Sequence, residues 1–177
     1  MDFKAFLQER ISQRLPVFFD GGMGTMIQAS GVTDYAIPED LSITRPDVIK
    51  SIHRKYLDAG CHVLTANTFG ANPLKLSSAP YSCSEYIKAE MKILRECVAE
   101  AEAAGNTRPH FISWDTGQIG RLLEPMGDLT FDEAYESYKQ AATLAEKEGA
   151  QVAIIETMSD LYEMKAAILA VQENTKM

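Results

Sequence analysis

Short apolar runs alternate with longer amphipathic segments along this chain of 177 residues. Runs rich in β-branched and aromatic side chains are typical of buried strands, and they fall at residues 16–20, 62–66, 110–115 and 151–156. Segments with apolar residues at helical spacing follow them, at residues 45–59, 84–104, 130–148 and 160–173. Near the N-terminus, Phe3, Phe6, Leu7 and Ile11 predict one short extra helix.

Capping and breaking residues support these boundaries. Pro46 suits the first turn of a helix, and Gly60 suits the position after its end. Thr130 and Glu133 have the spacing of a capping box, which predicts a helix start. Pro73 and Pro80 lie in the segment 72–82, so we expect a loop there.

This alternation of strands and helices predicts an α/β fold with a parallel sheet. The strands carry apolar residues almost without interruption, which favours burial on both faces of the sheet. Right-handed crossovers are expected between successive strands. The length fits a single domain that spans residues 1–177.

The charge balance narrows the classes of partner. Lys and Arg number 17 and Asp and Glu number 25, which leaves a formal net charge of −8. An acidic surface repels phosphate backbones and anionic headgroups, so we expect neither a nucleic-acid partner nor a membrane surface. No apolar run approaches the roughly 20 residues that span a bilayer. The N-terminal segment is charged and lacks the apolar stretch of a secretory signal, which favours the cytoplasm.

The chain has three cysteines, Cys61, Cys83 and Cys97. Their odd number and wide spacing make a poor disulfide framework. The sequence contains no Cys-x-x-Cys pair, and its three histidines do not fall at zinc-finger spacing. We therefore expect buried or half-buried thiols in a reducing compartment.

Polar residues follow the apolar runs where the predicted strands end. They are Asp20-Gly21-Gly22 with Gly24 and Thr25 at the end of the first run, Asn67-Thr68 directly after the second, Asp115 at the end of the third and Glu156 at the end of the fourth. Ligands of parallel α/β folds bind at the carboxyl ends of the strands. These groups are therefore candidates for one common site.

The residues alone leave the chemistry of that site open. The glycine-rich loop is either a tight turn or a nest of amides for an anion, and Ile27 stands where a dinucleotide fingerprint needs glycine. Asp20 and Glu156 either accept hydrogen bonds from backbone N–H groups or hold the ammonium of a ligand. Asn67 either caps a turn or contacts a ligand, and Asp115 lies either in the pocket or on a loop.

Four stretches carry a family resemblance: FDGGMGTMIQ at 19–28, LTANTFGAN at 64–72, the segment 117–128 with its GRLLEPMGD, and IIETMSDLYEMKAA at 154–167. With them the chain resembles the homocysteine S-methyltransferase family along essentially its whole length. Within that family it is more similar to the homocysteine-binding domain of cobalamin-dependent methionine synthases than to betaine–homocysteine methyltransferases.

The resemblance implies a (β/α)8 TIM barrel, a fold that needs about 250 residues. The 177 residues hold only the first four strand–helix units. We therefore expect residues 1–177 to form the N-terminal half of a homocysteine-binding barrel domain.

The resemblance also implies the roles of individual residues. Asp20 and Glu156 are expected to receive the ammonium of L-homocysteine. The backbone amides of the loop that contains Gly21, Gly22 and Thr25 are expected to receive its carboxylate. Asn67 and Thr68 are expected to line the pocket.

The family transfers a methyl group to L-homocysteine, which gives L-methionine, and zinc activates the thiol. The resemblance places the three zinc cysteines in an Asn-Cys element and a Gly-Gly-Cys-Cys element, and neither occurs in this sequence. No metal ligand is therefore assigned here. Methylcobalamin is the methyl donor that the resemblance implies. Alone the chain is expected to be inactive, because it needs the second half of the barrel or a second chain.

The sequence also allows two functions other than a part of a homocysteine methyltransferase. The chain is alternatively a non-catalytic half-barrel module, which binds an amino acid or self-associates through its open strand edges. The glycine-rich loop also suits a phosphate-binding α/β domain. Against that second rival, carboxylates at positions 20 and 156 would repel a phosphate.

Overall fold

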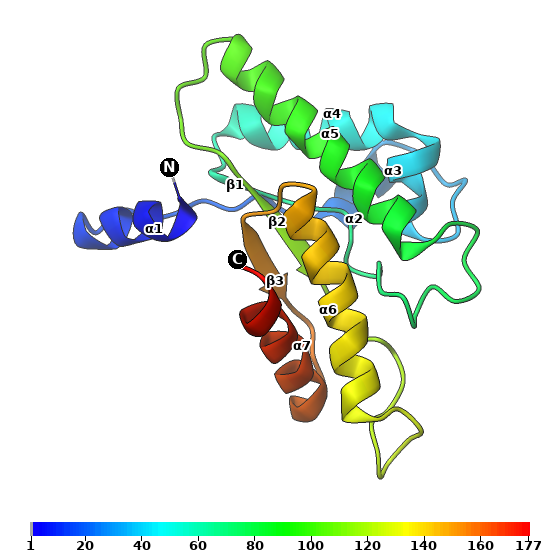
Figure 1. Ribbon diagram of the computed structural model, residues 1–177. Coiled ribbons are helices and arrows are strands. Elements are labelled where there is room, and N and C mark those ends of the chain that lie inside the picture. The colour runs from blue at the N-terminus through cyan, green and yellow to red at the C-terminus, as the bar shows by residue number, and fades with distance from the viewer. Residues whose placement is uncertain (1) are drawn as a thin grey trace.

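A parallel sheet of three strands forms the centre of the fold in the computed structural model, which describes residues 2–177 (Figure 1). The strands are β1 (Val63–Thr65), β2 (Phe111–Thr116) and β3 (Val152–Ile155), in the order β1-β2-β3. Val63 pairs with Phe111, and Asp115 pairs with Ile154. The predicted α/β class and the last three predicted strands are thus confirmed.

The predicted first strand, at residues 16–20, is reduced to an isolated parallel bridge between Phe19 and Val63. Phe18 and Phe19 keep 53% and 45% of their surface exposed, so the expected burial on both faces is wrong here. Pro16 contributes to the short pairing because it has no N–H to donate to a neighbouring strand.

The four long predicted helices are confirmed to within two residues at each end. They are α4 (Pro46–Ala59), α5 (Cys83–Ala103), α6 (Phe131–Lys147) and α7 (Leu161–Asn174). Figure 1 shows them beside the sheet, with α4 next to α5 and α6 next to α7. The predicted capping box of Thr130 and Glu133 opens α6, and Gly60 ends α4 with a φ of 94°. Residues 72–82 form the expected loop.

Side chains on the two faces of the sheet pack into two separate apolar clusters. Leu64, Ile112 and Trp114 are buried in the main core, which they share with the four long helices. Val63 and Phe111 point the other way and pack with Phe6 of α1 (Phe3–Ser12), the short helix predicted at the N-terminus. The ring centroids of Phe6 and Phe111 lie 5.0 Å apart. Helix α1 therefore covers the sheet at the starting ends of the strands.

Three short elements between Asp20 and α4 have no counterpart in the expected pattern. They are α2 (Met23–Ala29), η1 (Pro38–Asp40) and α3 (Leu41–Thr44). Asp40 stabilises the turn into η1, because its Oδ2 accepts the N–H groups of Ala36 and Ile37 at 3.0 and 3.2 Å. None of the helices in residues 2–177 is long and apolar enough to span a bilayer.

Candidate functional site

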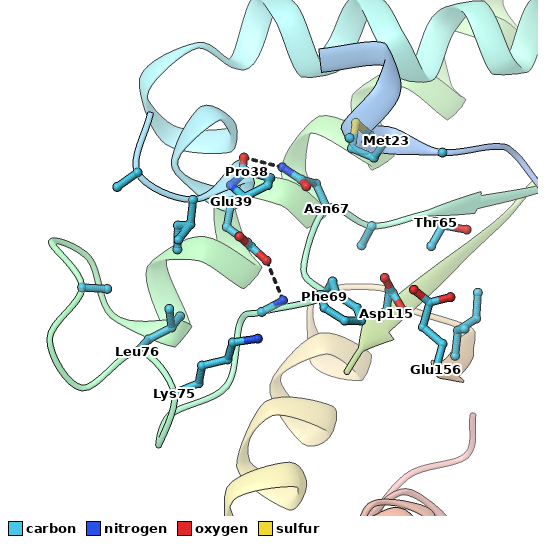
Figure 2. A pocket seen from close by; sticks show the side chains of 18 of the residues that line it. Met23, Pro38, Glu39, Thr65, Asn67, Phe69, Lys75, Leu76, Asp115 and Glu156 are labelled. Atoms are coloured by element: carbon cyan, nitrogen blue, oxygen red, sulfur yellow. Dashed lines mark hydrogen bonds between the residues drawn. The ribbon is translucent and has the colours of Figure 1, made fainter. Parts of the chain in front are cut away.

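A cavity of about 1210 Å³ lies at the carboxyl ends of the strands. The strand ends contribute Asp20 to its wall. They also contribute Thr65, Asn67, Asp115 and Glu156, which are labelled in Figure 2. Element η1 and the loop after β1 form another part of the wall, with apolar residues Ile37, Phe69 and Leu76. The structure thus places the cavity where the sequence pattern predicts a common site.

Asp20 and Glu156 line this same cavity, although 136 positions separate them in the chain. The Oδ2 of Asp20 accepts the backbone N–H of Thr65 at 2.8 Å, so its backbone partner comes from β1 rather than from the helix that follows it. Burial raises the pKa of Asp20. Glu156 follows β3 directly and keeps an exposed side chain.

Gly21 and Gly22 line the cavity between Asp20 and α2. Tyr56 of α4 supports this loop, because its hydroxyl donates to the carbonyl of Gly22 at 3.2 Å. A Cβ at Gly21 would lie 3.0 Å from that hydroxyl, so glycine permits the close approach. Thr25 lies outside the cavity lining, and its hydroxyl donates to the Gly22 carbonyl at 3.0 Å.

Asn67 lines the cavity, but its side chain is held by the protein. Its Nδ2 donates to the Pro38 carbonyl at 2.8 Å and to the Ser42 hydroxyl at 3.3 Å. Thr68 is buried outside the lining, and its hydroxyl donates to the Asp115 carbonyl at 2.8 Å. The two residues therefore connect the end of β1 to η1 and to β2.

A buried network lies behind Asn67. The carboxylate of Glu90 accepts the Ser42 hydroxyl at 2.6 Å and the Asn67 N–H at 3.1 Å, and it lies 2.7 Å from Nε2 of His53. Burial opposes the ionisation of Glu90, but the charge and hydrogen bond of His53 and the bonds from Ser42 and Asn67 outweigh it, so its pKa is lowered. One carboxylate thus joins α5 to α3, α4 and the end of β1.

Two charged residues of the cavity, Glu39 and Lys75, were not predicted from the sequence. Glu39 of η1 is 4% exposed, and its Oε1 accepts the Gly70 N–H at 2.5 Å. Burial raises its pKa. The Nζ of Lys75 lies 5.2 Å from the ring centroid of Phe69. No pattern marks either residue in the sequence, because both lie on irregular segments between the regular elements.

Asp115 is the group that the sequence left ambiguous, and the structure places it in the cavity wall at the end of β2. Its side chain is buried, with 7% of the residue exposed, and its Oδ1 has no hydrogen-bond partner. Burial, followed by the negative charges of Glu156, Asp20 and Glu39, raises the pKa of Asp115 to about 7.

The cysteines do not fit a zinc site. Cys61, Cys83 and Cys97 are all buried and unpaired, as expected for structural thiols. Burial raises the pKa to about 12 for Cys61 and Cys83 and to about 11 for Cys97, whereas zinc takes thiolates. Within residues 2–177, no three Cys, His, Asp or Glu side chains gather as a metal site would need.

The arrangement favours a small cationic or zwitterionic ligand. Four acids, Asp20, Glu39, Asp115 and Glu156, face the cavity together with one lining cation, Lys75. A charge-assisted hydrogen bond to an ammonium contributes about 1.5–3 kcal/mol. Apolar walls beside such polar groups are typical of a small-molecule site.

Comparison with known proteins gives one family. The sequence model described as "Homocysteine S-methyltransferase" matches residues 17–177. The methionine synthase of Mycobacterium leprae (strain TN) is 32% identical over 171 residues, and that of Mycobacterium tuberculosis (strain ATCC 25618 / H37Rv) is 33% identical over 172. Each match covers 92% of this chain but only 14% of the relative, so the chain spans a small part of those proteins.

Solved structures share the fold. The metallated form of the homocysteine methyltransferase MmuM from Escherichia coli superposes with a TM-score of 0.76 at 14% identity, over 93% of this chain and 62% of that one. The apo form of the same protein superposes with a TM-score of 0.70 at 15% identity, over 90% of this chain and 55% of that one. At such low identity the likeness establishes a common fold.

Proposed function

We propose that this chain, which belongs to the homocysteine S-methyltransferase family, binds L-homocysteine in the cavity at the carboxyl ends of its strands. The observation that carries the proposal is the meeting of Asp20 and Glu156 in one cavity wall. They come from opposite ends of the chain and end different strand segments, which is the placement that the family resemblance implies for the two ammonium-binding acids.

The ammonium of the amino acid is assigned to Asp20 and Glu156. Asp20 is half-buried and keeps one oxygen bonded to Thr65, which orients its carboxylate at the cavity wall. The loop amides between Gly21 and Thr25 are assigned to the substrate carboxylate by the family resemblance. Asn67 and Thr68 support the site from behind through their bonds to Pro38 and Asp115.

We further propose that residues 1–177 correspond to the first half of a TIM barrel. A parallel sheet with consecutive strand order, an additional bridge at Phe19 and helices beside it support this assignment. In such a domain the thiol-activating zinc is held by the Asn-Cys and Gly-Gly-Cys-Cys elements, which this sequence does not contain. The 177 residues by themselves should therefore bind the amino acid without transferring a methyl group.

The complete reaction is proposed as methyl transfer from methylcobalamin to L-homocysteine, which yields L-methionine. The family resemblance implies this donor, and the similarity to methionine synthases supports the product, L-methionine. The remaining part of the barrel, or a second chain, would supply the metal. A reducing cytoplasm is the proposed compartment, in agreement with three unpaired thiols.

The proposal is tested by titrating L-homocysteine into the 177-residue chain and into the variants Asp20→Asn and Glu156→Gln. Each substitution keeps the size of the side chain and removes one negative charge. We expect each to weaken binding at least tenfold, because a charge-assisted bond to an ammonium contributes about 1.5–3 kcal/mol. Isothermal calorimetry at pH 7 measures the change.

The matched control is Asp58→Asn, which removes the same charge from an exposed position of α4 outside the cavity. This variant should bind like the wild type. Equal affinity of the wild type and both cavity variants would refute the ammonium role of Asp20 and Glu156.

A second candidate function is a non-catalytic module that self-associates. The exposed rings of Phe18 and Phe19, beside a strand segment with a single bridge, favour it. Sedimentation equilibrium of the chain over a hundredfold concentration range distinguishes the two. A dimer that binds no amino acid supports the second candidate, whereas a monomer that binds L-homocysteine supports the first.

A further inference from the structure

Asp115 has a feature that Asp20 and Glu39, two other acids of the cavity, lack. Its Oδ1 is buried and has no hydrogen-bond partner among residues 2–177, whereas Asp20 and Glu39 each accept a backbone N–H. Six other buried side-chain atoms of residues 2–177 also lack a partner, but among these atoms only Oδ1 of Asp115 belongs to a residue that lines the cavity. The cavity wall is the place where a ligand could supply the missing donor.

The side chain of Asp115 is not needed to connect the strands. The backbone of Asp115 makes the structural contacts. Its carbonyl accepts a hydrogen bond from the Thr68 hydroxyl at 2.8 Å, and its N–H donates to the oxygen of that hydroxyl at 3.3 Å. The carboxylate is therefore free to face the cavity. Figure 2 shows it turned toward the carboxylate of Glu156.

Register explains why these two acids meet. Asp115 pairs with Ile154 across β2 and β3, and Glu156 lies two positions after Ile154. Side chains two apart on a strand share a face, so Asp115 and Glu156 point to the same side of the sheet. Asp20 and Glu39 are the other acids that act on Asp115, and Lys75 is the cation of the cavity lining.

Negative charges around a buried carboxyl disfavour its ionisation at neutral pH. Among the cavity acids Asp115 is the one whose pKa is raised to about 7, so it holds a proton for part of the time in the free chain. A cation that enters the cavity offsets the negative charges of Glu156 and Asp20. The ionised form of Asp115 then becomes the favoured one.

We propose that Asp115 is a third ammonium-binding residue of this site and that it releases a proton to the solvent when an α-amino acid binds. The inference rests on the proposed function and extends it. In the step, the O–H bond of the Asp115 carboxyl breaks and its proton passes to the buffer. The ligand ammonium keeps its three protons and donates one hydrogen bond to the freed Oδ1. No electrons are transferred.

The test measures binding heats of L-methionine and L-homocysteine at pH 7 in two buffers of different ionisation enthalpy. L-Methionine has the same ammonium and carboxylate but no thiol, so any proton that it releases does not come from a thiol. For the wild type we expect a buffer-dependent heat with both ligands, which corresponds to a net release of a fraction of a proton. Asp115→Asn should show no buffer dependence.

Affinity should follow the same pattern with pH. Between pH 7.8 and 5.5 the wild type is expected to lose about tenfold in affinity for L-methionine, because Asp115 must give up its proton before it binds. At pH 5.5 Asp115→Asn should bind L-methionine about as tightly as the wild type does. Its affinity should increase little between pH 5.5 and pH 7.8. The control Asp58→Asn should behave like the wild type at both pH values.

The possible results distinguish the role of Asp115 from the proposed binding of an amino acid. Saturable binding with identical proton release in wild type and Asp115→Asn would overturn the role of Asp115 and leave the proposed function intact. Absence of binding of both ligands to the wild type would overturn the proposed function and this inference together. If Asp115→Asn does not fold, the wild type alone still decides, since buffer-independent binding of L-methionine contradicts the proposal.

Discussion

A proton on Asp115 couples the stability of the chain to pH. The folded state raises the pKa of this group from 3.8 to about 7, so the folded chain binds a proton there more tightly than the unfolded chain does. Such a group stabilises the fold fully below its unfolded pKa. That contribution is lost as pH rises from about 4 to about 7.

Asp115→Asn should therefore be more stable than the wild type at pH 8. A rise from 3.8 to about 7 corresponds to about 4 kcal/mol, and we expect about 2–4 kcal/mol because the amide keeps some cost of burial. Below pH 4 the gain should disappear. Urea unfolding at pH 8 and at pH 4 measures both values, and equal stability at pH 8 would contradict the raised pKa.

Gly117 keeps the ring of Phe69 in the cavity wall. A Cβ at this position would lie 2.3 Å from Cε2 of Phe69, and the Gly117 N–H already donates to the Phe69 carbonyl at 2.9 Å. Gly117→Ala should displace the ring and cost about 1–3 kcal/mol of stability. We also expect a several-fold loss of L-homocysteine affinity, measured by calorimetry.

The control for the stability measurement is Gly24→Ala, since a Cβ there meets no atom within 4 Å. That variant should keep or slightly raise the stability, because alanine favours the helical conformation of α2 by about 0.5–1 kcal/mol. A Gly117→Ala variant as stable as the wild type would show that Phe69 is free to move.

The sequence was sufficient to predict that the polar residues at the ends of the apolar runs lie in one site. Asp20 and Glu156 end predicted strands, and the rule for parallel sheets brings them to one edge. Glu39 and Lys75 could not be placed in this way. They reach the cavity from irregular segments whose path depends on tertiary contacts such as the Glu39–Gly70 bond.

At the scale of elements, Glu90 connects α5 to α3, α4 and the end of β1. Removing one partner of a buried hydrogen-bonded charge leaves the others unpaired, which costs about 3–5 kcal/mol. We expect Glu90→Ala to lower the free energy of unfolding by that amount, as measured in urea. Glu102→Ala, at an exposed position near the end of α5, is the control and should change it by less than about 0.5 kcal/mol.

Glu90→Gln separates the charge from the contacts of that side chain. It keeps the acceptor for the Ser42 hydroxyl but loses the ionic contact with His53, so its cost should be smaller than that of Glu90→Ala. A Glu90→Ala variant as stable as the wild type would show that the network does not hold these elements together.

Helical period predicted the positions of the long helices, whereas the contacts of the folded chain decide which of their residues are buried. In α7, Leu161 is 80% exposed, and the buried face consists of Ala166, Ala167, Ala170 and Val171 with Glu163. Small side chains allow α6 and α7 to pack closely, which a search for large apolar residues overlooks. The predicted first strand, at residues 16–20, was wrong for a different reason. Its apolar run forms a single isolated bridge to β1 and no continuous ladder.

At the scale of the whole molecule, four acids meet one lysine in a single cavity. This imbalance agrees with a ligand that brings a positive charge and a negative one. The fold class and family could be recognised from sequence patterns, since the strand-end stretches are specific in combination. The shape of the cavity could not, because α2, η1 and the loop after β1 form much of its wall.

The most direct test is a calorimetric titration of the 177-residue chain with L-homocysteine at pH 7, with and without zinc. We expect saturable binding with a dissociation constant on the order of a millimolar, because a few charge-assisted bonds must offset the entropy lost on association. The affinity should be the same in both conditions, since the described cysteines form no metal site. No binding in either condition, or binding only with zinc, would contradict a preformed amino-acid site in these residues.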